Sequence, residues 1–339
     1  MKLARYILLR FAMLIGILFG VLIVTFVISR VLPGSPVEMM LGSRPTQEQI
    51  DQAKEELGLN DPIYVQLWNY TTSMAQGDLG KSFRTGQPVT TDLSQRYPAT
   101  VELVTLGLGL AVLFGIPLGV IAATKRRQLA DPLIRIFVLS GMAMPVFFLG
   151  ILLQLIFAGN LQLLPLQGRI DAEVLIDHPF KAVTGFYLID SLLAGDLVAF
   201  RSALAHLLLP ALTLALASLA IVTRVTRSLM NEVLSEDHIM AMRSYGMPNR
   251  RIHFYYALKA TCVPLLTVIG LTFGFMLGGS IIVEYVFDWP GLGGYIVSSL
   301  LTSDFNAVMG VTMVFSASYL MINLIVDILH HWLDPRLRI

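Results

Sequence analysis

Few residues of this chain have the type and spacing that chemistry requires. The segment 75–82, AQGDLGKS, fits a relaxed phosphate-binding loop in which Ala replaces the first Gly. Such a loop needs a buried strand before it and a helix after it, so that backbone amides can surround the phosphates. The residues before this segment have a helical pattern instead. We therefore predict that the segment binds no nucleotide.

Histidine and serine offer two further patterns. His330 and His331 are adjacent, and adjacent residues on a helix point in different directions, which disfavours a shared metal site. An intramembrane serine protease needs a Ser that faces a His at membrane depth. Val138 stands where this protease pattern needs a glycine two residues before Ser140, and His206 lies near the start of its apolar run, which is the expected outer end. We predict no catalytic, cofactor-binding or metal-binding residue in this chain.

The segment 235–251, SEDHIMAMRSYGMPNRR, predicts a short, charged surface helix between two long apolar runs. Ser235 can cap its first turn, and Gly246 supplies the left-handed residue that stops it. Ile239, Met242 and Tyr245 recur every three residues and form a partly apolar face. This pattern fits either a docking element for a protein partner or an amphipathic helix on lipid headgroups. The candidate residues are Ser235, Glu236, Asp237, Ile239, Ala241, Met242, Arg243, Tyr245 and Gly246.

The composition places these elements in a membrane. Of the 339 residues, 55% are hydrophobic and only 14% are charged, and the mean hydropathy is +0.70. Each of six charge-free runs has about the 20 residues that cross a bilayer as a helix. The sequence thus predicts an all-α, polytopic protein with six transmembrane helices. The runs are 11–29, 103–124, 136–158, 202–223, 260–283 and 305–326.

The placement of Lys and Arg predicts the orientation. Fifteen of the 24 basic residues fall on the two termini and on the loops after the second and fourth runs, whereas 284–304 has none. The positive-inside rule then puts both termini in the cytoplasm. We expect three parts: 1–30 with the first span, 31–100 as an extracytoplasmic helical loop, and 101–339 as a core with a cytoplasmic loop at 224–259.

The outer loop itself has helix signals. Thr46 and Gln49 form a capping box for a helix that ends at Gly58, and Asp61 with Pro62 begins a second helix that ends at Gly77. In the fifth run, Gly270, Gly274 and Gly278 recur every four residues, which lets another membrane helix approach closely.

Motifs along almost the whole chain resemble the permease subunits of binding-protein-dependent ABC importers of the dipeptide, oligopeptide and nickel type. In order, they are RVLPGSPVEMMLG, GDLGKSF, RYPATVEL, LLPLQGR, TGFYLIDSLLAGD, HLLLPALTL, VEYVFDWPGLGGYI and NLIVDILHHWLDPRLR. In this family the loop that includes Gly246 is the coupling helix that enters a groove of the ATPase. Tyr245 stands where relatives have a basic residue, so we expect a more apolar docking contact. SDFNAV at 303–308 also departs from the family pattern.

The resemblance implies a type I importer in a bacterial inner membrane. Its implied partners are a second, homologous permease, two ABC ATPase subunits that bind ATP and magnesium, and an extracytoplasmic solute-binding protein. The chain itself is then no enzyme. The implied substrates are di- or oligopeptides, with nickel chelates, glutathione or sugars left open. From the residues alone, a stand-alone secondary transporter, which would need acids in mid-span, and a receptor or structural membrane protein also remain.

A turn after the fifth run completes the candidate sites. In Asp288, Trp289, Pro290 and Gly291, proline fixes one dihedral angle and glycine tolerates an unusual one. We expect a rigid turn that presents Trp289 to the binding protein or to the mouth of the pathway. The alternative is that Trp289 anchors the chain at the membrane interface. We also expect the three glycines of the fifth run to face the second permease.

Overall fold

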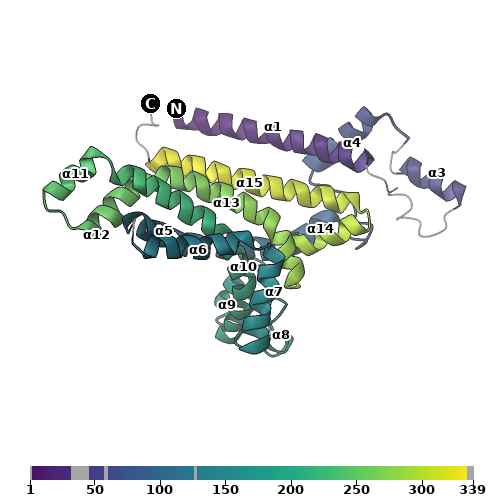
Figure 1. Cartoon of the computed structure of the whole chain (residues 1–339). Coiled ribbons are helices and arrows are strands. Elements are labelled where there is room, and N and C mark those ends of the chain that lie inside the picture. The colour runs from purple at the N-terminus through teal and green to yellow at the C-terminus, as the bar shows by residue number, and fades with distance from the viewer. Residues whose placement is uncertain (1, 32–45, 57–59, 126–127, 334–339) are drawn as a thin grey trace. The chain divides into compact units, whose positions relative to one another are not determined.

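The computed structural model describes residues 2–31, 46–56, 60–125 and 128–333, and these residues are helices and loops (Figure 1). The chain forms two compact units: Met1–Pro98 with Pro290–Leu320, and Ala99–Trp289 with Met321–Ile339. Two long helices, α5 (Val89–Thr124) and α15 (Phe305–Leu333), each begin in the first unit and end in the second. The three predicted parts follow membrane topology rather than packing, so they stay a prediction.

The first unit contains the two short helices that the sequence predicts between the first and second apolar runs. Its other helices are α1 (Lys2–Val31), α3 (Gln47–Glu56), α4 (Ile63–Ala75) and α14 (Leu292–Leu301). Thr46 and Gln49 form the predicted capping box, with the Thr46 N–H donating to Gln49 Oε1 at 2.9 Å and the Gln49 N–H donating to Thr46 Oγ1 at 3.4 Å. Gly77, at φ +81°, follows α4 as predicted. Gly58 lies outside the described residues.

The core of the first unit joins the start of α5 to α14 and to the start of α15. Its buried apolar residues, which come from these three helices, are Val89, Leu93, Leu292, Tyr295, Ala307 and Val311. A Cβ added at Gly310 would lie 2.7 Å from Val89 Cγ1, so glycine lets α15 approach α5 closely there. The unit therefore has an apolar core made by segments that are far apart in the sequence.

The second unit is arranged around the long helix α10 (Leu197–Leu234). Its neighbours are α6 (Ala130–Ala143), α7 (Val146–Leu153), α9 (Tyr187–Leu193) and α13 (Leu258–Val286). The Asp196 carboxylate caps α10 by accepting from the N–H groups of Val198 and Ala199. The Ala199 N–H in particular lowers the pKa of this carboxyl group. The remaining α-helices are α8 (Ala172–Asp177), α11 (Asp237–Ser244) and α12 (Asn249–Arg251), and two π-helical segments are η1 (Gln154–Asn160) and η2 (Ile252–Ala257).

The prediction of an all-α polytopic protein is confirmed, but the third span is not one straight helix. Within the described residues, five helices are long and apolar enough to cross a membrane, and a sixth crossing requires α6 and the run 146–160 together. These two are bent by 105°. The break falls at Met144, with ψ 135°, because the ring of Pro145 disfavours a helical conformation in the residue before it. The prediction of a single helix over 136–158 is therefore wrong.

Candidate functional site

The predicted docking helix is α11, which lies beside α12 at one end of the second unit (Figure 1). It starts two residues later than expected. Ser235 ends α10, and its hydroxyl donates to the carbonyl oxygen of Glu232 at 2.6 Å. The predicted capping role of Ser235 is therefore wrong, and Glu236 takes the position before the first helical residue. Asp237 lies in the first turn, where the helix dipole favours an acid.

The end of α11 agrees with the prediction. Gly246 has φ +74°, in the left-handed region. The Met247 N–H donates to the Met242 carbonyl oxygen at 3.1 Å, and the Gly246 N–H donates to that of Arg243 at 3.0 Å. This pair of hydrogen bonds is the Schellman arrangement, which satisfies carbonyl groups that a helix end leaves free. Gly246 therefore sets the direction in which the chain leaves the helix.

The prediction that α11 docks on a partner with its apolar face is wrong. Ile239 is fully buried against Val120, Met230 and other apolar residues of the same chain, and Met242 packs partly against that cluster. Tyr245, in contrast, is 90% exposed. The two inner residues attach α11 to its own subunit, because they are on the side that meets α5 and α10. The surface left for a partner is made of exposed residues: Asp237, His238, Met240, Ala241, Arg243, Ser244 and Tyr245.

The three glycines of α13 do not share one environment. Gly270 is buried, and a Cβ added there would lie 2.9 Å from Val326 Cγ2 on α15 of the same chain. Gly274 is half-buried, whereas Gly278 is exposed and has open space around it. Gly270 thus belongs to packing within the subunit. The interface with a second permease stays a prediction for Gly274 and Gly278.

The turn after α13 also differs from the prediction. Asp288 has φ +47°, which turns the chain back over the end of the helix. Trp289 is only 2% exposed, and its Nε1–H donates to the carbonyl oxygen of Ala99 on α5 at 2.9 Å. Trp289 is therefore neither an exposed docking side chain nor an anchor at the membrane interface. The role of Asp288, Pro290 and Gly291 at the outer pathway stays a prediction.

Trp289 lies next to a buried ion pair that the sequence analysis did not single out. Arg169 is 7% exposed and binds the Glu102 carboxylate of α5 through Nη2. The same Nη2 donates to the Gly185 carbonyl oxygen at 2.6 Å. The guanidinium carbon lies 3.8 Å from the ring centre of Tyr187 and 5.7 Å from that of Trp289. The cation is thus held by an acid and by two aromatic faces.

The second carboxylate oxygen of Glu102 binds the start of α9. Its Oε1 accepts from the Leu188 N–H at 2.8 Å, in the first turn of α9. The ion pair, these hydrogen bonds and the stacked rings together attach residues 169–188 to α5. The signal was in the sequence, because each of four family motifs supplies at least one of the residues that meet here: RYPATVEL, LLPLQGR, TGFYLIDSLLAGD and VEYVFDWPGLGGYI.

A second polar cluster lies in the first unit. Asp304 is fully buried and accepts from the Ser82 hydroxyl at 2.6 Å, while Asn306 donates to the Lys81 carbonyl oxygen at 3.0 Å. Although residues 303–308 differ from the family pattern, Asp304 and Asn306 therefore make polar contacts at this corner. Nearby, burial raises the pKa of Tyr295, so its hydroxyl keeps its proton and donates to Asp92 at 3.0 Å.

Comparison with known proteins gives the chain relatives along its whole length. Residues 115–339 match the family described as binding-protein-dependent transport system inner membrane component, and residues 3–104 match the N-terminal family of such membrane components.

Three relatives illustrate the similarity. A probable D,D-dipeptide transport system permease protein of Escherichia coli (strain K12) is 44% identical over 324 residues, which cover 96% of this chain and 94% of the relative. A di/tripeptide transport system permease protein of Pseudomonas aeruginosa (strain UCBPP-PA14) is 38% identical, with 97% of each chain covered. A glutathione transport system permease protein of Escherichia coli O6:H1 is 33% identical and covers 98% of this chain and 99% of the relative.

Proposed function

Because the chain belongs to the family of inner membrane components of binding-protein-dependent transport systems, we propose that it is a permease subunit of an ATP-driven importer of short peptides. The observation that carries the substrate class is the similarity over nearly the full length to permeases named for dipeptides and for di- or tripeptides. The glutathione permease is less similar. Glutathione, nickel chelates and sugars are therefore the alternative cargoes, and the family assignment argues against a stand-alone secondary transporter.

The chain forms the translocation path together with a second permease, and two ATPase subunits bind ATP and magnesium. In this proposal α11 and the residue after it enter a groove of one ATPase with their exposed side, which includes Met240, Arg243 and Tyr245. Ile239 transmits the motion of α11 to the bundle, because it is buried among residues of α5, α10 and η2. ATP binding closes the ATPase pair, α11 moves with it, and the bundles open outward in alternating access.

An extracytoplasmic solute-binding protein delivers the peptide to the outer surface. The segment 169–188 is a candidate contact for it, because the Arg169 and Glu102 pair holds this segment in one position on α5. A fixed outer surface can bind a partner without first losing conformational entropy. With the termini and α11 in the cytoplasm, the positive-inside rule places this segment on the opposite side of the membrane.

Uptake into proteoliposomes tests the proposal. The permease pair is reconstituted with its ATPases, ATP is enclosed on the ATPase side, and the binding protein is added on the other side. We expect uptake of radiolabelled D-alanyl-D-alanine or L-alanyl-L-alanine that requires both ATP and the binding protein. A non-hydrolysable ATP analogue serves as the control. Dipeptide uptake that continues without ATP, or uptake of glutathione in place of both dipeptides, would refute the corresponding part of the proposal.

A further inference from the structure

Two cavities lie between α5, α6 and α10 in the second unit. One has a volume of about 270 Å³ and has Val138, Met142 and Ala220 on its apolar side and Thr223, Arg224 and Arg227 on its polar side. The other has a volume of about 250 Å³, and its lining includes Leu110, Phe114, Leu212 and Leu216. Every residue that lines this second cavity is apolar.

The two cavities follow one continuous strip of the helices. On α5, residues 110, 114, 118 and 122 line them in turn, and on α10 residues 212, 216, 220 and 224 do the same. Residues four apart lie on the same face of a helix. From Leu212 to Arg227 the strip is about 22 Å long, at 1.5 Å per residue. That exceeds the roughly 15 Å of hydrocarbon in one leaflet of a bilayer.

The polar end of the strip has a positive charge without a counter-ion among the residues that the structure describes. Arg227 is neutralised, because its Nε and Nη2 bind the two oxygens of Asp131 at 2.9 and 2.8 Å. Arg224 has no ion pair or hydrogen bond within the described part of the chain. Thr223 is 3% exposed, and its hydroxyl has no hydrogen-bond partner among the described residues. A buried hydroxyl without a partner is costly, so a bound acceptor would be favoured here.

We propose that this strip binds one anionic phospholipid, with its phosphate at Arg224 and Thr223 and one acyl chain directed towards Leu212. A guanidinium group can hold two phosphate oxygens at once, and the Thr223 hydroxyl can donate to a third. The unbalanced charge selects an anionic over a zwitterionic headgroup. A dipeptide would fill only the cavity at Arg224 and would leave the apolar one empty.

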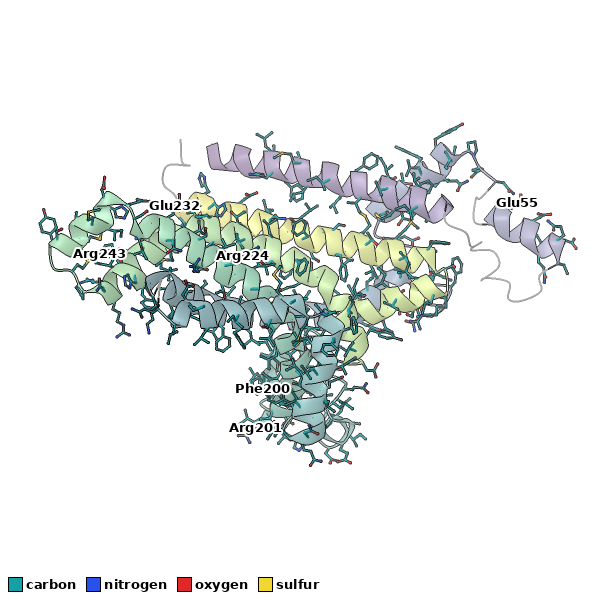
Figure 2. All side chains as sticks on the ribbon, in the orientation of Figure 1. Glu55, Phe200, Arg201, Arg224, Glu232 and Arg243 are labelled. Atoms are coloured by element: carbon teal, nitrogen blue, oxygen red, sulfur yellow. The ribbon has the colours of Figure 1, made fainter. Side chains whose placement is uncertain are left out.

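Native mass spectrometry of the intact transporter complex tests the headgroup site. The complex is titrated in detergent with dioleoyl phosphatidylglycerol and, separately, with dioleoyl phosphatidylcholine. We expect one phosphatidylglycerol to bind in preference to phosphatidylcholine, and R224Q to lower the phosphatidylglycerol affinity roughly five- to tenfold, as expected for one basic residue at a headgroup. R201Q is the matched control, because Arg201 is an exposed residue of the same helix that lies apart from Arg224 (Figure 2).

A second variant tests the acyl-chain path. L216W fills the apolar cavity and should weaken both lipids, whereas R224Q should weaken only the anionic one. Equal binding of the two lipids by the wild type, or an unchanged affinity in R224Q, overturns the proposal. Displacement of phosphatidylglycerol by millimolar alanyl-alanine would assign the cavity to a peptide and would also overturn it. If L216W fails to fold, the comparison of lipid affinities between R224Q and the wild type still tests the proposal.

Discussion

At the scale of single residues, backbone conformation and side-chain burial limit what a residue can do. Gly246 is needed for its left-handed conformation, since a Cβ added there would meet no atom within 4 Å. Trp289 is needed for what its indole ring contacts inside the second unit. The two residues therefore predict different kinds of mutant, one that is impaired in coupling and one that is impaired in folding.

We expect Gly246→Val to uncouple ATP hydrolysis from uptake while insertion into the membrane is kept. A non-glycine residue in the left-handed region costs about 1–2 kcal/mol, and that cost favours another path for the chain leaving α11. Asn tolerates this region, so Gly246→Asn is the control and should keep most of the coupling. The measurement is ATPase activity stimulated by the binding protein in proteoliposomes. Coupling at wild-type rates in Gly246→Val would instead indicate a helix on the lipid surface.

We expect Trp289→Ala to destabilise the second unit by about 3–5 kcal/mol, as is usual when a buried aromatic side chain is removed. The Ala99 carbonyl oxygen also loses its donor. Trp289→Phe keeps most of the packing and should lose less. Thermal unfolding of the purified permease in detergent measures both effects. Unchanged stability of Trp289→Ala together with lost stimulation by the binding protein would restore the docking role that the sequence predicts.

At the scale of elements, buried contacts decide which segments move together. The Glu102 and Arg169 pair joins α5 to the segment 169–188, which leads into α9. Ile239 joins α11 to the bundle, whereas Tyr245, directly after α11, is exposed. One element is thereby fixed to α5. The other has a buried side that attaches it to the bundle and an exposed side that we expect to dock on a partner.

We expect Glu102→Gln to loosen the outer segment, because it leaves Arg169 as a buried cation without its anion. Breaking a buried ion pair on one side costs about 3–5 kcal/mol. The exposed Lys181 lies within this segment and gives trypsin a cleavage site, so the variant should be cut there faster than the wild type. Glu173→Gln makes the same chemical change at an exposed position of α8 and should be cut at the wild-type rate. Equal cleavage of both variants would contradict the role of the pair.

We expect Ile239→Ala and Tyr245→Ala to separate attachment from docking. Truncation of a buried Ile costs about 2–5 kcal/mol, so Ile239→Ala should lower the thermal stability of the permease even without ATPases. Tyr245→Ala should leave that stability unchanged and reduce the amount of ATPase that co-purifies. The reverse pattern, in which only Ile239→Ala loses the ATPase, would mean that α11 docks with its inner side.

At the scale of the whole molecule, the surface requires a membrane. Large apolar side chains such as Leu8, Phe11 and Ile15 are more than half exposed along α1. A soluble protein rarely exposes so continuous an apolar surface. Lipid tails are surroundings that can cover it, and the distribution of basic residues predicts which end of each span faces the cytoplasm.

We expect cysteines on the two sides of the membrane to react in opposite ways. In a Cys262→Ala background, Thr302→Cys lies in the loop without basic residues and should react with an impermeant thiol reagent added to intact spheroplasts. Tyr245→Cys, which replaces the exposed residue directly after α11, should react only after lysis. Labelling of Thr302→Cys only after lysis would reverse the predicted orientation.

The sequence by itself determined the helical membrane class and several helix boundaries. It did so because hydropathy and capping are local properties. Runs of about 20 apolar residues, the Thr46 and Gln49 capping box and the stop at Gly246 each depend on residues close together in the chain. The family motifs likewise predicted a permease, which the comparisons support over the whole length.

Tertiary structure alone decided which residues meet. The periodicity of 235–245 placed Ile239 and Tyr245 on one face. In the structure α11 has only eight residues, and Ile239 is on the side that packs against α5 and α10. Tyr245 follows the end of α11 and is not on that side. Burial of Trp289 depends on Ala99, which is 190 residues away, and Arg169, which lies in a loop, needs Glu102 from α5. Such contacts join distant segments, so a local sequence pattern can identify candidate residues but cannot predict which of them contact each other.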